Sequence, residues 1–139
     1  MLKTNSNLKL YKNGLFFLSL GGIGEIGANC YLYCCDGKWI MIDLGLSFAD
    51  EQFPGVDLLV PKIKFIEEIK DNLEAVIISH GHEDHAGAVA YLADYIKCPV
   101  YASSFAKLLI QNRLKEFGKL DTIELIEVLL VYHQPFHWE

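Results

Sequence analysis

His80-Gly81-His82-Glu83-Asp84-His85-Ala86-Gly87 is the stretch that decides the interpretation of this 139-residue chain. It contains three of the chain's five histidines, with an aspartate between the last two. Imidazole is the commonest metal ligand, and a neighbouring carboxylate suits a water-activating divalent ion such as zinc. Successive side chains of an extended loop point in different directions, so one loop can face two adjacent ions. The motif therefore predicts a metal site, against the alternative of a solvated turn that is rich in histidine.

The composition is that of one globular domain. The chain is 52% hydrophobic and 22% charged, and its formal net charge is −6. Length and composition together favour a single domain. The negative charge argues against nucleic-acid binding through a basic surface, although bound cations supply local positive charge for phosphates. No apolar stretch reaches the roughly 20 residues of a membrane span, so we expect no membrane partner.

The cysteine pattern favours a reducing compartment. The four cysteines, Cys30, Cys34, Cys35 and Cys98, contain no C-x-x-C pair. Three of them stand in strand-like or apolar surroundings, and the chain is more hydrophobic than most disulfide-framework domains. We therefore expect buried, reduced thiols and a cytoplasmic location.

The order of apolar patterns predicts a mixed α/β domain. Strands are expected over 15–20, 29–35, 38–43, 74–79, 98–101 and 123–132, helices over 61–72, 85–96 and 105–117, and a loop over 44–60. Asp36-Gly37 is a strong hairpin signal between two of the strands. Asp84 is placed to cap the second helix, Ser103 or Ser104 to cap the third, and Gly118 to end it. The sheet therefore opens antiparallel and continues with helical crossovers.

A glycine loop precedes the first hairpin. Gly22-Ile23-Gly24-Glu25-Ile26-Gly27 matches G-x-G-x-x-G, but a dinucleotide site needs a helix that opens directly after the glycines. Residues 29–35 favour a strand instead, so we reject a dinucleotide site. Glycine permits close backbone approach, and we expect this loop to lie close beneath another site, through its four glycines Gly21, Gly22, Gly24 and Gly27.

The residue types of the motif suggest a division of roles between two metal ions. We expect His80 and His82 to hold one zinc, and Asp84 and His85 to hold the second, with Asp84 also classed as catalytic. A hydroxide shared by two zinc ions is a strong nucleophile at neutral pH. Asp43 ends an apolar run, and we expect it to receive the free N–H of a liganding histidine. The alternative for Asp43 is a strand-end residue that caps a turn.

Several stretches together resemble a known family. They are Leu20-Gly21-Gly22-Ile23-Gly24-Glu25-Ile26-Gly27-Ala28-Asn29, then Ile42-Asp43-Leu44-Gly45 with Phe48, then Pro54-Gly55-Val56-Asp57-Leu58-Leu59-Val60-Pro61, and the histidine motif. His-x-His-x-Asp-His after an apolar strand is similar to the metallo-β-lactamase fold. The glycine loop and the Pro-Gly-Val-Asp segment resemble the ribonuclease J family of the β-CASP group. The resemblance covers about residues 15–118.

The resemblance implies a fold, a reaction and a cofactor. The fold is α/β, a metallo-β-lactamase-like αββα sandwich of which only the N-terminal half is present. Members of the family are zinc-dependent, with two Zn²⁺ in a complete site. They act on RNA as 5′-to-3′ exonucleases and as endonucleases in RNA maturation and decay. RNA is therefore the expected substrate.

The chain also departs from the family's pattern. The family supplies a further histidine in a Thr-His-Ser-x-Pro-like segment, a later aspartate and a later histidine, and none of these is recognisable here. His133 and His137 are the only candidates, and neither context matches. The β-CASP insert and C-terminal domain are absent, and residues 128–139 do not resemble the family. We therefore interpret residues 1–139 as an N-terminal piece, inactive by itself, whose expected partner is the missing half of the domain.

Two other functions stay open from the sequence alone. The chain could be a non-catalytic remnant that binds one zinc or none, and zinc stoichiometry would separate that from an enzyme. It could also be another hydrolase of the same fold that acts on a small ester or thioester. Activity on 5′-monophosphorylated RNA, compared with a thioester, would decide between these two hydrolases.

Overall fold

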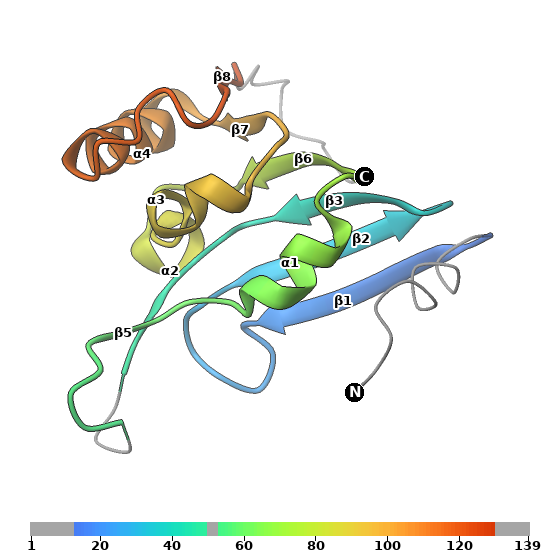
Figure 1. Ribbon diagram of the computed structural model, residues 1–139, viewed down its shortest axis with the longest axis horizontal. Coiled ribbons are helices and arrows are strands. Elements are labelled where there is room, and N and C mark those ends of the chain that lie inside the picture. Colours follow the sequence, from blue (N-terminus) through green and yellow to red (C-terminus); the bar gives the residue numbers. More distant parts are fainter. Residues whose placement is uncertain (1–12, 50–52, 130–139) are drawn as a thin grey trace, which may run out of the picture.

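The central sheet confirms the predicted mixed α/β fold. The computed structural model describes residues 13–49 and 53–129. The main sheet has six strands in the order β1-β2-β3-β6-β7-β8 (Figure 1). The first three are antiparallel neighbours, whereas β3, β6, β7 and β8 run parallel to one another. The bounds are β1 (Leu15–Gly21), β2 (Cys30–Cys35), β3 (Lys38–Ile42), β6 (Leu73–Ile78), β7 (Val100–Ala102) and β8 (Leu125–Glu127).

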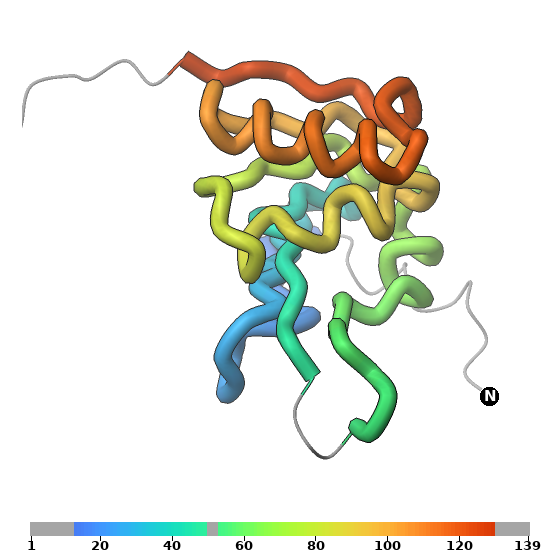
Figure 2. The backbone as a smooth tube through the Cα atoms, turned by 90° about the vertical axis from the view of Figure 1, so that its left-hand side faces the viewer, coloured from blue at the N-terminus to red at the C-terminus, as the bar shows by residue number. Residues whose placement is uncertain are grey.

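Helices cover one face of this sheet. They are α1 (Ile63–Ile69), α2 (Glu83–Ala86), α3 (Val89–Leu92), a 3₁₀ turn (Ala93–Tyr95) and α4 (Ser104–Glu116). Figure 1 shows α1 and α3 in front of the sheet, and Figure 2 shows α4 beside β8. The fully buried Trp39 of β3 meets Phe65 of α1 edge to face, with 5.5 Å between ring centroids. Among the helices of the described ranges, none combines the length and the apolar character that a membrane span requires.

The opposite face of the sheet is apolar and exposed in the described part of the chain. Phe17 of β1 pairs with Tyr33 of β2, which pairs with Ile40 of β3, and all three side chains are exposed. Ile77 of β6 is exposed as well. The main sheet therefore has helices on one of its faces only, which corresponds to two of the four layers of an αββα sandwich.

The prediction of one continuous helix over 85–96 is wrong. The chain instead makes two short helices, α2 and α3, followed by the 3₁₀ turn, and His82 rather than Asp84 occupies the N-cap of α2. The backbone carbonyl of Asp84 accepts the N–H of Asn29 at 2.9 Å, and that of His85 accepts the N–H of Leu44 at 2.8 Å. Hydrogen bonds to distant segments therefore replace those that would have continued the helix.

Other boundaries differ by smaller amounts. The expected loop over 44–60 contains a second, two-stranded sheet, β4 (Ser47–Phe48) with β5 (Leu58–Leu59). Helix α1 is shorter than the predicted 61–72, and Ser103 occupies the N-cap position of α4 without a side-chain capping bond. The predicted Asp36-Gly37 turn is confirmed, since both residues have positive φ between β2 and β3. The predicted strand over 123–132 is limited to β8, and residues 130–132 lie outside the described ranges.

Only one of the four cysteines is exposed, and this gives a first testable prediction. All four are thiols, with Cys30, Cys34 and Cys98 buried and Cys35 exposed. Burial, helped by the nearby Asp43 carboxylate, raises the pKa of the Cys30 thiol to about 12, and burial raises that of Cys98 to about 11. A protonated thiol is a poor nucleophile. We therefore expect one fast-reacting thiol per folded chain at pH 8 and four after denaturation.

A thiol-specific chromogenic reagent measures this count. The Cys35→Ser variant should lose the fast reaction, whereas the Cys98→Ser variant should keep it. Fast modification of two or more thiols in the folded chain would contradict the burial of Cys30, Cys34 and Cys98.

Candidate metal centre

The histidine motif lies at the edge of the sheet where parallel strands end. Ser79 and His80 directly follow β6, and the chain then turns into α2. Strand β6 lies between β3 and β7 and runs parallel to both. Ligand sites of open α/β sheets lie at the carboxyl ends of such strands. Asp43, which directly follows β3, is at the same edge.

The structure brings together the four residues predicted to bind metal. The ring centroid of His80 lies 4.6 Å from that of His82 and 4.1 Å from that of His85. Oδ2 of Asp84 lies 3.4 Å from Nε2 of His85. In residues 13–49 and 53–129, however, no group of three or more His, Cys, Asp or Glu side chains has the arrangement that would hold an ion. Their role as ligands therefore stays a prediction.

Asp43 is the buried acid of this edge, with 3% of its surface exposed. Its Oδ1 accepts the backbone N–H of Ser79 at 2.7 Å, and its Oδ2 accepts the Ser79 hydroxyl at 2.8 Å. Oδ2 also lies 2.7 Å from Nδ1 of His85. The hydrogen bond to a histidine that we expected of Asp43 is thus present. The φ of Asp43 is 62°, a left-handed conformation that aspartate tolerates better than most residues.

These contacts determine which ring nitrogen of His85 carries the proton. A carboxylate can only accept, so Nδ1 of His85 carries the hydrogen that Asp43 receives. Nε2 of His85 lies 3.2 Å from the side-chain nitrogen of Asn29, which can only donate. The two contacts agree that Nε2 carries the lone pair, which accepts from Asn29 here and is the one that a metal ion would use in its place.

The same logic extends to His80 through one hydroxyl. The Ser79 hydroxyl donates to Asp43, so its oxygen is left to accept from Nδ1 of His80 at 3.0 Å. Nε2 of His80 then also keeps its lone pair. The donor chemistry of both imidazoles therefore fits a divalent metal, with one buried carboxylate fixing the two rings.

Asn29 belongs to the site although its role was not predicted. Its side-chain nitrogen donates to the backbone oxygen of Asp84 at 3.0 Å and lies 3.2 Å from Oδ2 of the same residue. Its side-chain oxygen accepts the hydroxyl of Tyr31 at 2.8 Å. The available signal was a polar residue directly after the glycine loop, at the start of an apolar strand. Ser79 was missed in the same way, as a small polar residue at a strand end.

The glycine loop reaches the motif through Asn29. A Cβ at Gly22 would lie 2.4 Å from both Oδ1 of Asn29 and the Tyr31 hydroxyl, and one at Gly21 would lie 2.2 Å from the Ala28 carbonyl oxygen. A Cβ at Gly27 would lie 2.9 Å from Oγ of Ser47, whereas one at Gly24 would meet nothing within 4 Å. Close packing thus accounts for three of the four glycines, Gly21, Gly22 and Gly27, and Gly24 is explained by its φ of 78°.

A two-metal site needs more protein ligands than the motif supplies. Catalytic zinc usually has three protein ligands and one open position. Two ions would therefore need about six protein ligands, and the four side chains of the motif are too few. His133 and His137, the two other histidines of the chain, lie outside the described residues.

Comparison with known families identifies the superfamily of this chain. A model described as the metallo-beta-lactamase superfamily matches residues 23–134, which include most of the glycine loop, Asp43 and the whole histidine motif. The chain belongs to the metallo-beta-lactamase superfamily. The fold class predicted from His-x-His-x-Asp-His is therefore confirmed.

Within the metallo-beta-lactamase superfamily, curated relatives carry the name ribonuclease J. Ribonuclease J of Sinorhizobium meliloti is 46% identical over 103 residues, which are 71% of this chain and 18% of that protein. Ribonuclease J 1 of Streptococcus pyogenes serotype M3 is 36% identical over 115 residues, 83% of this chain and 20% of that protein. The predicted resemblance to the ribonuclease J family is thus confirmed. The chain spans about a fifth of the length of these relatives.

One solved structure is also similar to this chain. It is described as "Crystal Structure of a New Diphosphatase from the PhnP Family". The similarity has a TM-score of 0.49 at 19% identity and covers 84% of this chain and 51% of that one.

Proposed function

We propose that this chain carries part of the metal centre of a zinc-dependent ribonuclease of the ribonuclease J type. The reaction is hydrolysis of RNA phosphodiester bonds by 5′-to-3′ exonuclease and endonuclease action. The observation that carries the proposal is the buried Asp43 carboxylate, which orients His85 directly and His80 through Ser79. The relatives named ribonuclease J, at 36% to 46% identity, support the choice of RNA over other substrates.

The residues of the chain divide into ligands and groups that orient them. His80 and His82 would hold one ion, and Asp84 and His85 the other. When bound, zinc would lower the pKa of water from about 15.7 towards 7 and would stabilise the negative charge that develops on the phosphoryl oxygens. Asp43 keeps the proton of His85 on Nδ1, away from the metal-facing nitrogen. Asn29 is not a ligand in this proposal.

The composition of the chain does not favour a cationic surface that could bind RNA. Its net charge of −6 leaves phosphate recognition to the metal centre and to parts of the protein that these 139 residues do not contain. RNA as a partner is therefore proposed for the whole protein, and activity of the isolated chain is not expected.

A chimera tests this proposal. The 103 residues of Sinorhizobium meliloti ribonuclease J that match this chain are replaced by the corresponding residues of this chain. We expect the chimera to cleave 5′-monophosphorylated RNA and to lose this activity in a chelator. His82→Ala in the graft should lower the rate by more than the roughly 100-fold that removal of an orienting residue costs. The matched control is Lys64→Met, a substitution in the middle of the chain on the exposed side of α1.

Three other results would contradict the proposal. A folded chimera that binds zinc but leaves RNA intact argues against the nuclease. Hydrolysis of a thioester in place of RNA favours the other hydrolase of this fold. Absence of zinc from both the isolated chain and the chimera favours the non-catalytic remnant. Among the described residues, no group of three or more potential ligands is arranged to hold an ion, which is compatible with that outcome.

A further inference from the structure

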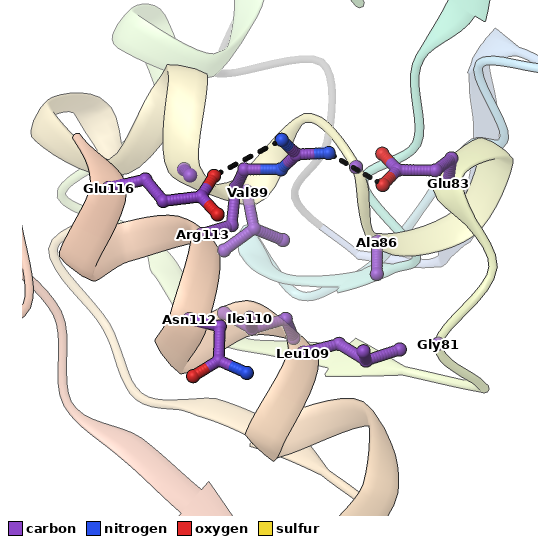
Figure 3. Close-up of a pocket in the computed structure, with 11 residues that line it drawn as sticks. Gly81, Glu83, Ala86, Val89, Leu109, Ile110, Asn112, Arg113 and Glu116 are labelled. Atoms are coloured by element: carbon purple, nitrogen blue, oxygen red, sulfur yellow. Dashed lines mark hydrogen bonds and ion pairs between the residues drawn. The ribbon is translucent and has the colours of Figure 1, made fainter.

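Arg113 of α4 reaches the histidine motif along a cavity of about 300 Å³ (Figure 3). Figure 3 shows its guanidinium between two carboxylates on opposite sides. One nitrogen donates to Oε1 of Glu83 at 2.9 Å, and another donates to Oε2 of Glu116 at 3.2 Å. Glu83 stands between His82 and Asp84 in the sequence. A helix that carries no predicted ligand is therefore tied to the middle of the motif.

We propose that Arg113 is a positioning residue of the metal centre, which holds Glu83 and through it the backbone that directs His82 and Asp84. This inference rests on the proposed zinc site, because the directions of those two side chains matter only where they bind metal. It assigns α4 the task of holding the motif through Glu83, in addition to the backbone contacts that residues 44–46 make with it.

The glycines of the motif make room for this clamp. A Cβ at Gly87 would lie 2.5 Å from Oε2 of Glu83 and 2.4 Å from its backbone oxygen. A Cβ at Gly81 would lie 2.7 Å from Cδ1 of Leu109 on α4. Neither glycine has a positive φ, so the effect of a side chain there would be steric. At Gly87 it would meet the Glu83 backbone oxygen, whereas at Gly81 it would meet the flexible end of Leu109. Both motif glycines thus allow the approach of α4 and the placement of the Glu83 carboxylate.

The two carboxylates that contact Arg113 are not equivalent. Hydrogen bonding to Glu83 is the largest cause of a raised pKa of Arg113, ahead of the contribution of Glu116. Glu116 lies on the same helix at i+3, so its ion pair positions no other element. Exposed ion pairs add little to global stability because solvent screens them. Loss of Arg113 should therefore disturb the motif locally and leave the unfolding transition almost unchanged.

The test compares Arg113→Met and Glu83→Gln in the full 139-residue chain. Lys115→Met is the matched control, since it removes a cation from the same helix, and the Lys115 side chain has no hydrogen bond or ion pair to other residues that the structure describes. Zinc affinity is measured by competition with a chromophoric chelator. Amide hydrogen exchange at positions 85–87 and in β6 is measured on the zinc-free chain, together with urea unfolding.

We expect Arg113→Met and Glu83→Gln each to weaken zinc binding about tenfold, with the double variant no weaker than either. Exchange at positions 85–87 should accelerate while β6 and the unfolding midpoint stay unchanged, and Lys115→Met should match the parent chain. Unchanged affinity and exchange overturn the inference, and so does faster exchange throughout the sheet. A parent chain that binds no zinc, together with a chimera that binds none, contradicts the proposed function. Accelerated exchange confined to 85–87 would even then support Arg113 as the clamp of the motif.

Discussion

Replacing Asp43 by asparagine is expected to keep the fold and to weaken zinc binding by about 10-fold to 100-fold. Asparagine has nearly the shape of aspartate and tolerates the left-handed φ of 62° at this position. Its amide oxygen can still accept the backbone N–H of Ser79. Its amide nitrogen, however, then faces Nδ1 of His85, and a donor cannot accept the hydrogen that this nitrogen carries.

The imidazole of His85 resolves this conflict by moving its proton. We expect the hydrogen in Asp43→Asn to lie on Nε2, where it can turn to Oδ2 of Asp84, 3.4 Å away, and where the Asn29 amide must give way. This removes the lone pair that metal binding requires. The buried site also loses charge-assisted hydrogen bonds, so we expect a loss of about 1–3 kcal/mol in the free energy of unfolding. The effect on zinc is therefore predicted to come from the tautomer and to exceed what this destabilisation explains.

Nitrogen chemical shifts of the His85 ring in the zinc-free chain measure the tautomer, and chelator competition measures the affinity. Asp36→Asn is the matched control, because Asp36 is an exposed hairpin residue that also has a positive φ of 50°. It should leave both readouts unchanged. An Asp43→Asn chain with its proton still on Nδ1 and with normal zinc affinity would refute the orienting role.

The parts of the site that follow from strand order could be predicted from sequence. Parallel strands end at a common edge, so a carboxylate after one strand and a histidine loop after the next were expected to meet. Oδ2 of Asp43 and Nδ1 of His85 are indeed in contact, at 2.7 Å, whereas metal binding by His85 stays a prediction. Residue type at the end of an apolar run was sufficient for that inference.

The contacts that hold the motif from outside could not be predicted in this way. Asn29 lies 55 positions before Asp84, and Arg113 lies 30 positions after Glu83. Both pairs depend on how a glycine loop and a surface helix fold back, which no periodicity in the sequence records. The broken helix after Asp84 has the same cause. The backbone carbonyl of Asp84 accepts the N–H of Asn29 in place of a helical N–H. Local helix propensity depends on neighbouring residues only and does not include such a distant hydrogen bond.

Gly45→Ala is expected to destabilise the chain by about 3 kcal/mol and to displace the histidine motif. A Cβ at this buried position would lie 1.7 Å from the backbone oxygen of Asp84 and 2.8 Å from the backbone nitrogen of His85. Backbone atoms cannot rotate away as a side chain can. The flanking residues make relief harder, since Leu44 donates to the His85 carbonyl at 2.8 Å and Leu46 donates to the Glu83 carbonyl at 3.0 Å.

Gly118→Ala separates this steric effect from backbone strain. Gly118 has a φ of 65°, and a Cβ there would meet nothing within 4 Å, so its substitution should cost about 1 kcal/mol through conformation alone. Gly45 lacks a positive φ, so its larger cost comes from space alone. Urea unfolding of both variants gives the comparison, and chelator competition should show zinc binding lost only in Gly45→Ala. A Gly45→Ala chain as stable as Gly118→Ala would mean that residues 44–46 are not closely packed against the histidine motif. The position of the motif would then not depend on these backbone contacts.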